Sequence, residues 1–443
     1  MSVFFGTDGL RGVALSDITF DIAYKCGNSI SQNLQKGSKV IIAKDTRVSG
    51  DMIVSAVSAG IMCGGVDVTY VGTVPTGALA YLTTLGYDYG IMITASHNPP
   101  EYNGIKIFNS KGEKLQDSEE EKIERCFIKS KVSSPMNVGR MKEEPSLIKK
   151  YVSFICQTSC QLHGLRIVID CSNGATHKVA PLVFKNLGAR VYKTSCTPNG
   201  EKINQNCGSL HTKNLSKMVV RKSADIGFAF DGDGDRLIAV DEKGNEIDGD
   251  KVLTALATFY KSRNELTKNK VVGTSQTNMG VQKTLEKRGI SLERADVGDK
   301  YVLEIMKKQN LLLGGEQSGH VIIRKFMQTG DGILTAVQLA YCLKQSEKEA
   351  SELCKCEKFP QININIETKD KLRVLGSEKL SDAILVVQQE LAGNGRVLVR
   401  ASGTEPKIRI MVESENFQEA KNLAEYIRRI VCEIIKEGQP CVE

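Results

Sequence analysis

The segment DGDGDR places three carboxylates, Asp231, Asp233 and Asp235, at alternate positions separated by glycines. Carboxylates this close repel one another, and the repulsion is costly unless a cation binds them. Their hard oxygen atoms favour Mg²⁺ or Ca²⁺. Two other interpretations stay open, a solvated acidic turn and an EF-hand loop that would end at Glu242. An EF-hand needs glycine where Arg236 stands, and the flanking segments have the pattern of strands, so we favour a catalytic divalent-cation site.

A serine stands in the loop TASHNPPEYNG, which follows the apolar run GIMI at residues 90–93. Asn-Pro pairs mark turns, so a surface turn is one interpretation. A hydroxyl is a poor nucleophile without a base or a metal, and no GxSxG motif of a hydrolase surrounds Ser96. His97 adjoins it, but adjacency in sequence does not make a catalytic pair. A phosphoryl group on Ser96 would add about −1.5 to −2 charges and would need a cation, which the three aspartates would supply.

Two further loops carry residues suited to a sugar and to a phosphate. GGEQSGH brings Glu316, Ser318 and His320 between glycines, which suits sugar hydroxyls, although this loop alone favours an ordinary turn. RASGTEPKIR has the composition of a phosphate cradle without the GKS/T ending of a nucleotide-hydrolysing P-loop. The candidate phosphate ligands are Arg400, Ser402, Gly403, Thr404 and Arg409. Taken together, the loops predict phosphoryl transfer to and from a sugar phosphate, with Ser96 as the phosphoryl carrier.

The elements that must position these loops repeat along the chain. Three segments each lead from a β-branched run through a Gly-containing turn into a helical pattern. They are residues 38–50, 165–176 and 269–280. Each is followed by a strand, a polar loop and a second strand. These cover residues 90–108, 225–240 and 310–323.

The chain beyond about Phe359 alternates strands and helices without this repeat, which is typical of a smaller α+β domain. We therefore expect three similar α/β domains with mixed sheets, followed by that smaller domain. The expected boundaries are 1–145, 146–248, 249–358 and 359–443. Each domain presents one polar loop, so the four loops could surround a single cleft.

Composition restricts the class of protein and its partners. The 443 residues are 41% hydrophobic and 25% charged, and no apolar run reaches the ~18 residues of a membrane span. Thirteen cysteines without an export signal predict reduced thiols and a cytoplasmic location. The net charge of +7 favours an anionic partner. We expect a small phosphorylated ligand and no nucleic acid, because the densest basic cluster, Lys217 to Lys222, is short and no nucleic-acid motif is present.

Eight motifs resemble those of the phosphohexomutase superfamily, and they span nearly the whole chain. They are FGTDGLRG (5–12), DTRVSG (45–50), TASHNPPEYNGIKIF, DGDGDR, VGDKYVLE (297–304), GGEQSGH, TGDGI (329–333) and RASGTEPKIRIMVE. The GEQSGH and SGTEP spellings resemble the glucosamine branch of the superfamily. Mannose and glucose enzymes usually differ at the position of Gln317, whose carbonyl is a candidate acceptor for an ammonium on the sugar.

The resemblance implies a four-domain, heart-shaped enzyme with a central cleft. It implies a phosphoserine at Ser96, and Mg²⁺ held by that phosphate and the three aspartates. Lys106 would be a general acid/base, with His320 as a second candidate. Arg11 and Arg236 would support the phosphoserine and the transferring group. Sugar hydroxyls would be bound by Glu316 and Ser318, and the phosphate that is not transferred by the RASGTEPKIR residues.

The reaction that the resemblance implies interconverts glucosamine 6-phosphate and glucosamine 1-phosphate through a bisphosphate intermediate. Glucosamine or glucose 1,6-bisphosphate would be an activator, and the product would feed UDP-N-acetylglucosamine synthesis. One alternative is a mutase for mannose or glucose phosphates. A second is an inactive sugar-phosphate-binding protein, although every reactive position is intact. The sequence leaves a homodimer open.

Overall fold

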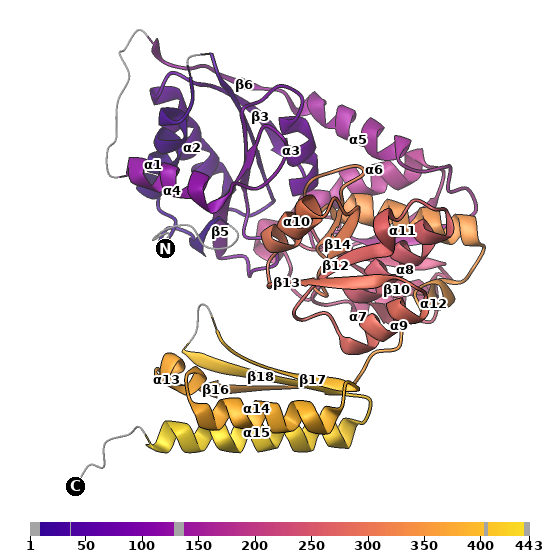
Figure 1. Cartoon of the computed structure of the whole chain (residues 1–443). Helices are drawn as coiled ribbons and strands as arrows, with labels where there is room; N and C mark the ends of the chain where they lie inside the picture. Colours follow the sequence, from indigo (N-terminus) through magenta and orange to yellow (C-terminus); the bar gives the residue numbers. More distant parts are fainter. Residues whose placement is uncertain (1–8, 36, 128–136, 403–405, 438–443) are drawn as a thin grey trace. The chain divides into compact units, whose positions relative to one another are not determined.

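The computed structural model describes residues 9–35, 37–127, 137–402 and 406–437. The chain divides into two compact units, whose elements are labelled in Figure 1. The larger unit consists of Met1–Gln276 and Ile290–Lys355, and the smaller of Thr277–Gly289 and Cys356–Glu443. In the part of the chain that the structure describes, no helix has the length and apolarity that crossing a membrane requires.

The first sheet of the larger unit has six strands in the order β1-β5-β4-β2-β3-β6. The strands are β1 (Leu10–Val13), β2 (Lys39–Lys44), β3 (Asp67–Thr73), β4 (Tyr89–Ile93), β5 (Tyr102–Asn109) and β6 (Met141–Glu143). The helices are α1 (Phe20–Gln32), α2 (Gly50–Cys63), α3 (Thr76–Thr83) and α4 (Asp117–Phe127). Glycines let α1 and α2 pack closely, since a Cβ at Gly27 would stand 2.1 Å from the Val57 carbonyl oxygen. The apolar residues of β2 and β4 pack against these two helices.

The second sheet has five strands in the order β11-β10-β9-β7-β8. The strands are β7 (Arg166–Asp170), β8 (Arg190–Thr194), β9 (Ile226–Phe230), β10 (Leu237–Asp241) and β11 (Glu246–Ile247), with helices α5 (Ile148–Gln157), α6 (Val179–Asn186) and α7 (Lys213–Arg221). Strand β9 is buried along its whole length, as expected for an apolar strand at the centre of a sheet.

The third sheet has four strands in the order β13-β12-β14-β15. The strands are β12 (Lys270–Thr274), β13 (Ser291–Ala295), β14 (Leu313–Gly315) and β15 (Val321–Ile323). The accompanying helices are α8 (Gly249–Ser262), α10 (Asp299–Lys308), α11 (Gly332–Ser346) and α12 (Ala350–Leu353).

The three sheets share one plan, which confirms the predicted repeat of α/β domains with mixed sheets. In each, a parallel strand (β2, β7 or β12) is followed by an antiparallel hairpin, and the hairpins are β4–β5, β9–β10 and β14–β15. Parallel neighbours require a crossover connection, which the helices provide, whereas a hairpin can turn back directly. The polar loops noted in the sequence are the connections of these three hairpins.

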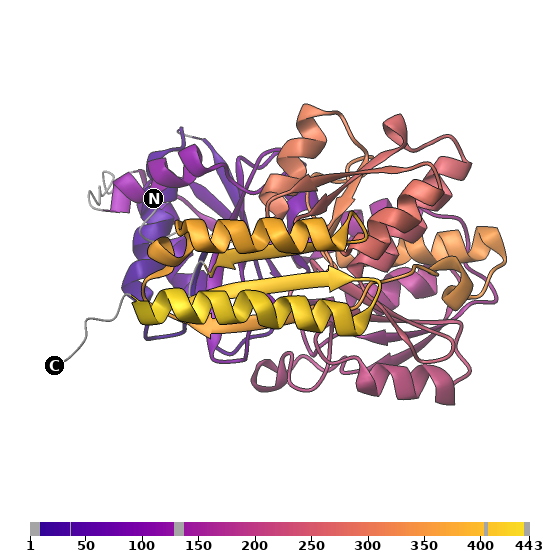
Figure 2. The same cartoon turned by 60° about the horizontal axis from the view of Figure 1, so that its bottom comes forward.

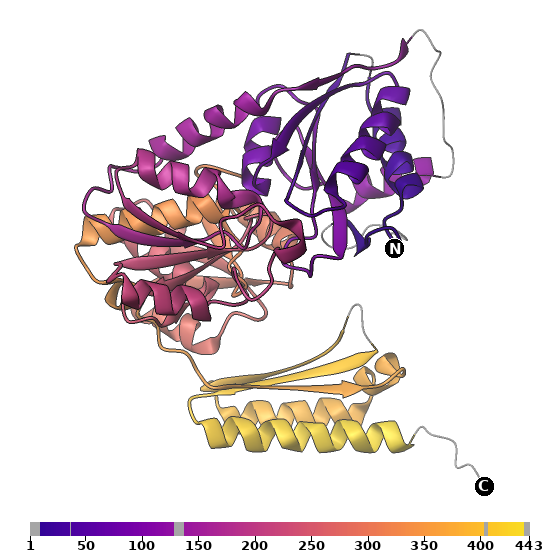
Figure 3. The same ribbon diagram turned by 180° about the vertical axis from the view of Figure 1, so that it is seen from behind.

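The smaller unit has an antiparallel sheet with two long helices on one face, as predicted for the C-terminal α+β domain (Figures 2 and 3). Its strands are β16 (Gln361–Glu367), β17 (Gly395–Ala401) and β18 (Lys407–Ser414), and its helices are α9 (Met279–Lys287), α13 (Lys371–Leu375), α14 (Glu378–Leu391) and α15 (Phe417–Glu437). Alternate residues of β18 turn one apolar face to α14 and α15, where Ile408, Ile410 and Val412 are buried.

Candidate active site

The hairpin between β9 and β10 carries the three aspartates. Asp231, Asp233 and Asp235 are buried, and one carboxylate oxygen of each lies within 4.8 Å of the others. The intervening glycines permit this crowding. A Cβ at Gly232 would stand 2.6 Å from the backbone oxygen of Ser96, and Gly234 adopts a left-handed φ of +73°.

The donor set of this cluster fits a hard divalent cation. The Oδ1 atoms of Asp233 and Asp235 are buried and accept no hydrogen bond from the described residues. Burial, and then the charges of Asp235 and Asp233, raise the pKa of Asp231 well above its usual range. Burial also disfavours the ionised form of Asp235, but the Lys106 and His320 charges outweigh burial and hold its pKa well below the usual range. A bound cation would offset the remaining repulsion.

The EF-hand alternative is wrong. The aspartate loop connects two antiparallel strands, whereas an EF-hand loop connects two helices. Glu242, which would end the EF-hand loop, accepts hydrogen bonds from the backbone N–H and the hydroxyl of Ser351 instead.

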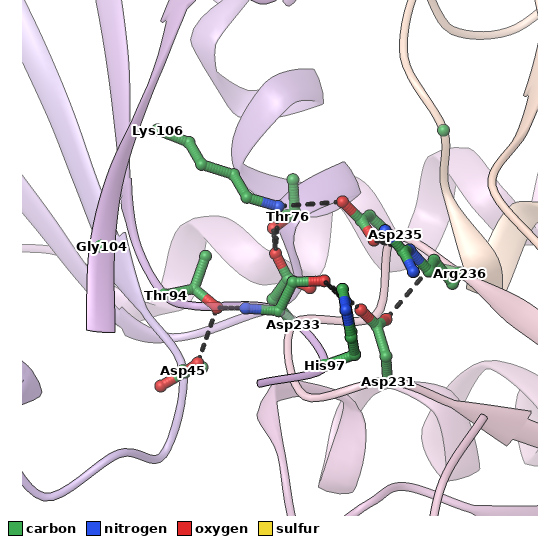
Figure 4. A network of polar contacts seen from close by, with 12 residues as sticks. Asp45, Thr76, Thr94, His97, Gly104, Lys106, Asp231, Asp233, Asp235 and Arg236 are labelled. Atoms are coloured by element: carbon green, nitrogen blue, oxygen red, sulfur yellow. Dashed lines mark hydrogen bonds and ion pairs between the residues drawn. The ribbon is translucent and has the colours of Figure 1, made fainter. Parts of the chain in front are cut away.

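Ser96 reaches this cluster from the β4–β5 hairpin. Its hydroxyl lies 2.6 Å from Oδ2 of Asp231, and the residue is 1% exposed. Its backbone has a left-handed φ of +52°, which is uncommon for a residue with a side chain. The Ser96 N–H donates to the Thr94 hydroxyl at 2.9 Å. That hydroxyl donates to Asp45 at 2.7 Å (Figure 4). The loop is thus fixed in a conformation that directs the serine at the aspartates.

His97 lies beside the serine but is a poor candidate for a charged partner. Its Nδ1 is 3.4 Å from the Ser96 hydroxyl oxygen. Burial, and then the nearby Arg236 and Arg11 charges, lower the pKa of His97 to about 4. The ring is therefore neutral at neutral pH, and both arginines lie close enough to act on it.

Lys106 and Thr76 contact the aspartates from the first sheet and its helix α3. The Lys106 ammonium donates to Asp233 at 2.9 Å and to Asp235 at 3.0 Å, and its side chain is 2% exposed (Figure 4). The Thr76 hydroxyl donates to the same Oδ2 of Asp233 at 2.7 Å. Arg236 contributes its backbone N–H, which donates to Asp231 at 3.2 Å. These contacts join the first and second sheets at one polar centre.

The β14–β15 hairpin brings His320 to the same centre. Its Nδ1 is 3.7 Å from Asp235, and its Nε2 is 3.2 Å from Asp299. Burial disfavours the imidazolium, but Asp299 and then Asp235 outweigh burial and raise the pKa of His320 to about 10. The N–H of Gly330 also points at Nε2, at 3.2 Å, but two carboxylates outweigh this single neutral donor. His320 is therefore a cation at neutral pH.

The other residues of this hairpin are held by one another and by neighbouring loops. Glu316 accepts from the backbone N–H of Gly298 at 3.0 Å and from the Ser318 hydroxyl at 3.1 Å. The Gln317 amide nitrogen lies 3.5 Å from Asp248, the N-cap of α8. The structure thus brings Glu316 and Ser318 together and turns the amide nitrogen of Gln317 toward a carboxylate.

The candidate phosphate cradle lies in the smaller unit, at the ends of β17 and β18. Arg400 and Arg409 stand directly opposite each other, and Arg409 donates to the Ser402 hydroxyl at 3.3 Å. Burial, and then the Arg409 charge, lower the pKa of Arg400. Like charges opposite each other across a sheet are destabilising, so an anion would be favoured here. Gly403 and Thr404 lie outside the described residues.

Three contacts near these sites were not anticipated from the sequence. Asp299 belongs to the quoted motif VGDKYVLE, which could have identified it, and it also pairs with Lys114 at 2.6 Å. Thr76 stands in TVPTGALA (73–80), which none of the eight motifs includes. Lys371 donates to the Ser402 carbonyl oxygen at 2.9 Å, and no motif marks it.

Four domain families match the chain in order. They are phosphoglucomutase/phosphomannomutase α/β/α domains I, II and III, over residues 2–133, 148–244 and 248–359, and the C-terminal domain over residues 362–430. A phosphoglucosamine mutase of Thermoanaerobacter sp. is 46% identical, with 97% of this chain and 99% of that protein aligned. A phosphoglucosamine mutase of Clostridium botulinum is 45% identical over the same shares.

A solved structure shows the same fold. A phosphoglucomutase/phosphomannomutase family protein of Burkholderia thailandensis superposes with a TM-score of 0.83 at 24% identity, covering 99% of this chain and 98% of that one. The sequence matches run through all four domains and include the relatives at 45–46% identity. The chain therefore belongs to the phosphoglucomutase/phosphomannomutase family, the phosphohexomutases, and groups with its phosphoglucosamine mutase members.

Proposed function

We propose that the protein is a phosphoglucosamine mutase, which interconverts glucosamine 6-phosphate and glucosamine 1-phosphate through a phosphoserine at Ser96. The observation that carries the proposal is the buried contact of the Ser96 hydroxyl with Asp231, at 2.6 Å, inside a cluster of three aspartates. The names of the relatives at 45–46% identity support the amino-sugar substrate over glucose or mannose phosphate. An inactive binding protein is disfavoured because the reactive side chains converge.

The three aspartates and a phosphate on Ser96 would hold one Mg²⁺. The residues present fit this ion, since two carboxylate oxygens are buried without a hydrogen-bond partner among the described residues. When bound, such an ion stabilises negative charge on a transferring phosphoryl group.

The phosphoryl transfer is assigned to side chains around Ser96. The sugar hydroxyl attacks the phosphorus and gives up its proton, the bond from phosphorus to the serine oxygen breaks, and that oxygen takes up a proton, which leaves a free Ser96 hydroxyl and the bisphosphorylated sugar. After that sugar reorients, its other phosphate returns to Ser96 by the reverse steps. Lys106 is the proposed acid/base group, because its buried ammonium lies at the aspartates. His320, charged and held by two carboxylates, is better suited to stabilise negative charge than to accept a proton.

The remaining residues are proposed to bind the substrate. Glu316 and Ser318 would bind sugar hydroxyls, and Gln317 would accept a hydrogen bond from the sugar ammonium. Arg11 and Arg236 would support the phosphoserine. The phosphate that is not transferred would be bound by Arg400, Ser402, Gly403, Thr404 and Arg409. The support for this last assignment is the pair of opposed guanidinium groups, which favours an anion.

A coupled assay with glucosamine, glucose and mannose phosphates tests the function. We expect kcat/KM to be about tenfold or more higher for glucosamine phosphate than for the other two sugars. This factor corresponds to the free energy of roughly one hydrogen bond to a charged group. Excess EDTA should abolish turnover, and Mg²⁺ should restore it. Equal use of glucose or mannose phosphate would overturn the substrate assignment. Full activity in EDTA would overturn the metal assignment. We also propose that a sugar 1,6-bisphosphate activates the protein, that the protein is cytoplasmic and that it forms a homodimer.

A further inference from the structure

Two side chains with no role assigned so far donate hydrogen bonds to the backbone of the serine loop. Arg47 lies in the motif DTRVSG, and Asn204 lies in none of the eight motifs. The carbonyl oxygen of Ser96 accepts from Nη2 of Arg47 at 3.0 Å and from Nδ2 of Asn204 at 2.9 Å. The carbonyl oxygen of Asn98 accepts from the same two atoms, at 2.8 Å and 3.0 Å. Two donors from separate parts of the larger unit therefore hold the same pair of carbonyl groups.

Arg47 lies in the connection between β2 of the first sheet and α2. It is 0% exposed, and its Nε donates to Asp45 at 3.0 Å. Its Nη1 donates to the carbonyl oxygens of Pro99 and Tyr102. Removing it would take one donor from each of four carbonyl groups of the loop and the guanidinium from the buried Asp45 carboxylate, so its loss would disturb the whole loop.

Asn204 belongs to a loop beside the second sheet and makes fewer hydrogen bonds than Arg47 does. It lies between the end of β8 and α7, and its backbone N–H donates to the Ser172 carbonyl oxygen at 3.0 Å. Both hydrogen bonds that the structure gives its side chain go to the serine loop. A Cβ at Gly232 would stand 2.6 Å from the Ser96 carbonyl oxygen and 3.0 Å from the Asn204 amide nitrogen. The aspartate loop, the serine loop and Asn204 therefore meet at one point.

This contact bears on catalysis because Ser96 is held in an uncommon backbone conformation. Its φ of +52° is disfavoured for a residue with a Cβ, so the surroundings must maintain it. The orientation of the Ser96 peptide group determines where the hydroxyl points. The Asn204 amide binds this carbonyl from the connection that follows β8, so it also fixes the serine relative to Asp231 in the neighbouring β9–β10 loop.

We propose that Asn204 is a positioning residue for phosphoryl transfer, one that holds the Ser96 peptide in register with the aspartate loop without touching substrate. The inference rests on the proposed function, since it presumes that Ser96 carries the phosphoryl group. It assigns a role in the reaction to the segment NGEKINQNCGS (199–209), for which the sequence motifs gave none.

The same loop offers a matched control. Asn206 also has a left-handed φ, +56° against +60° for Asn204, but its side chain is exposed and donates no hydrogen bond to the described residues. Glycine accepts this φ without strain at both positions, so Asn204→Gly and Asn206→Gly differ mainly in the lost amide. We expect Asn204→Gly to lower kcat by about 10- to 100-fold, as misplacement of reacting groups does, with KM unchanged. Asn206→Gly should keep the wild-type kcat.

An isosteric variant tests the same hydrogen bonds if Asn204→Gly folds poorly. Asn204→Asp keeps the shape but replaces the donor with an acceptor that faces two carbonyl groups, so kcat should fall at least as far as in Asn204→Gly. A wild-type kcat in either folded Asn204 variant would overturn the inference, and so would a rise in KM at constant kcat.

Wild-type enzyme and Ser96→Ala, assayed alongside, separate this inference from the proposed function. Inactive wild-type enzyme, or an active Ser96→Ala variant, would refute the proposed function itself. An active wild type, an inactive Ser96→Ala and a wild-type kcat in Asn204→Gly would refute only the role of Asn204.

Discussion

Replacing Lys106 with methionine should destabilise the larger unit in a way that Mg²⁺ partly reverses. The Lys106 ammonium lies 2.9 Å and 3.0 Å from two buried carboxylates, and its side chain is 2% exposed. Removing one partner of a buried ion pair costs about 3–5 kcal/mol, because the remaining charge is left buried without compensation. Lys106→Met keeps the side-chain volume and leaves Asp233 and Asp235 without that cation. We therefore expect a loss of about 3–5 kcal/mol in EDTA.

Urea unfolding in EDTA and in excess Mg²⁺ measures this effect. The variant should recover part of its lost stability in Mg²⁺, because the cation then replaces the missing ammonium charge. Lys270→Met is a control. The Lys270 ammonium pairs with Glu293 at 3.2 Å, but the Lys270 side chain is 30% exposed. Loss of this more exposed ion pair should cost less than about 1 kcal/mol. Turnover of Lys106→Met should fall about 10²- to 10⁴-fold, as for a lost acid/base group. A loss below about 1 kcal/mol in EDTA, or a normal kcat, would refute the reasoning.

Three further predictions concern other parts of the site. The pKa of His320 is raised from 6.5 to about 10. The contribution of the charged imidazole to the free energy of unfolding is therefore fully present below pH 6.5 and is lost as pH rises through about 10. Thermal melts should show wild-type stability declining over that interval, and less so in His320→Gln; parallel curves would contradict this. Arg400→Ala should mainly raise KM, by a factor corresponding to about 2–5 kcal/mol, whereas a pure kcat effect would remove it from phosphate binding. Gln317→Met should reduce the preference for glucosamine over glucose phosphate without abolishing transfer, and an unchanged ratio would exclude Gln317 from recognition of the ammonium.

The fold could be predicted from the sequence because its signals are local. Each buried strand reads as a β-branched run, and each hairpin as two such runs around a polar, Gly-containing loop. That pattern is enough to locate the loops of β4–β5, β9–β10 and β14–β15 in the sequence. The boundaries at residues 145, 248 and 358 stay predictions. The two compact units divide the chain differently, with α9 in the smaller unit.

The site could be predicted only where chemistry is concentrated in a short segment. Three aspartates within six residues predict a cation site without any other information. Asn204 and Thr76 carry no such signal, because a single amide or hydroxyl acquires a role only when the fold places it against a partner far away in sequence. The charge state of His320 is likewise set by Asp299 and Asp235, which approach it from different elements.

Transfer of labelled phosphate tests the central claim most directly. Enzyme carrying radiolabelled phosphate on Ser96 is mixed with unlabelled glucosamine 6-phosphate, and the label and the Ser96 phosphopeptide are followed through a few turnovers. The account predicts that the label moves to the sugar phosphates while Ser96 stays phosphorylated, because the other phosphate of the bisphosphate returns to it. Isomerised sugar without label, with the label retained on the protein, would contradict the account.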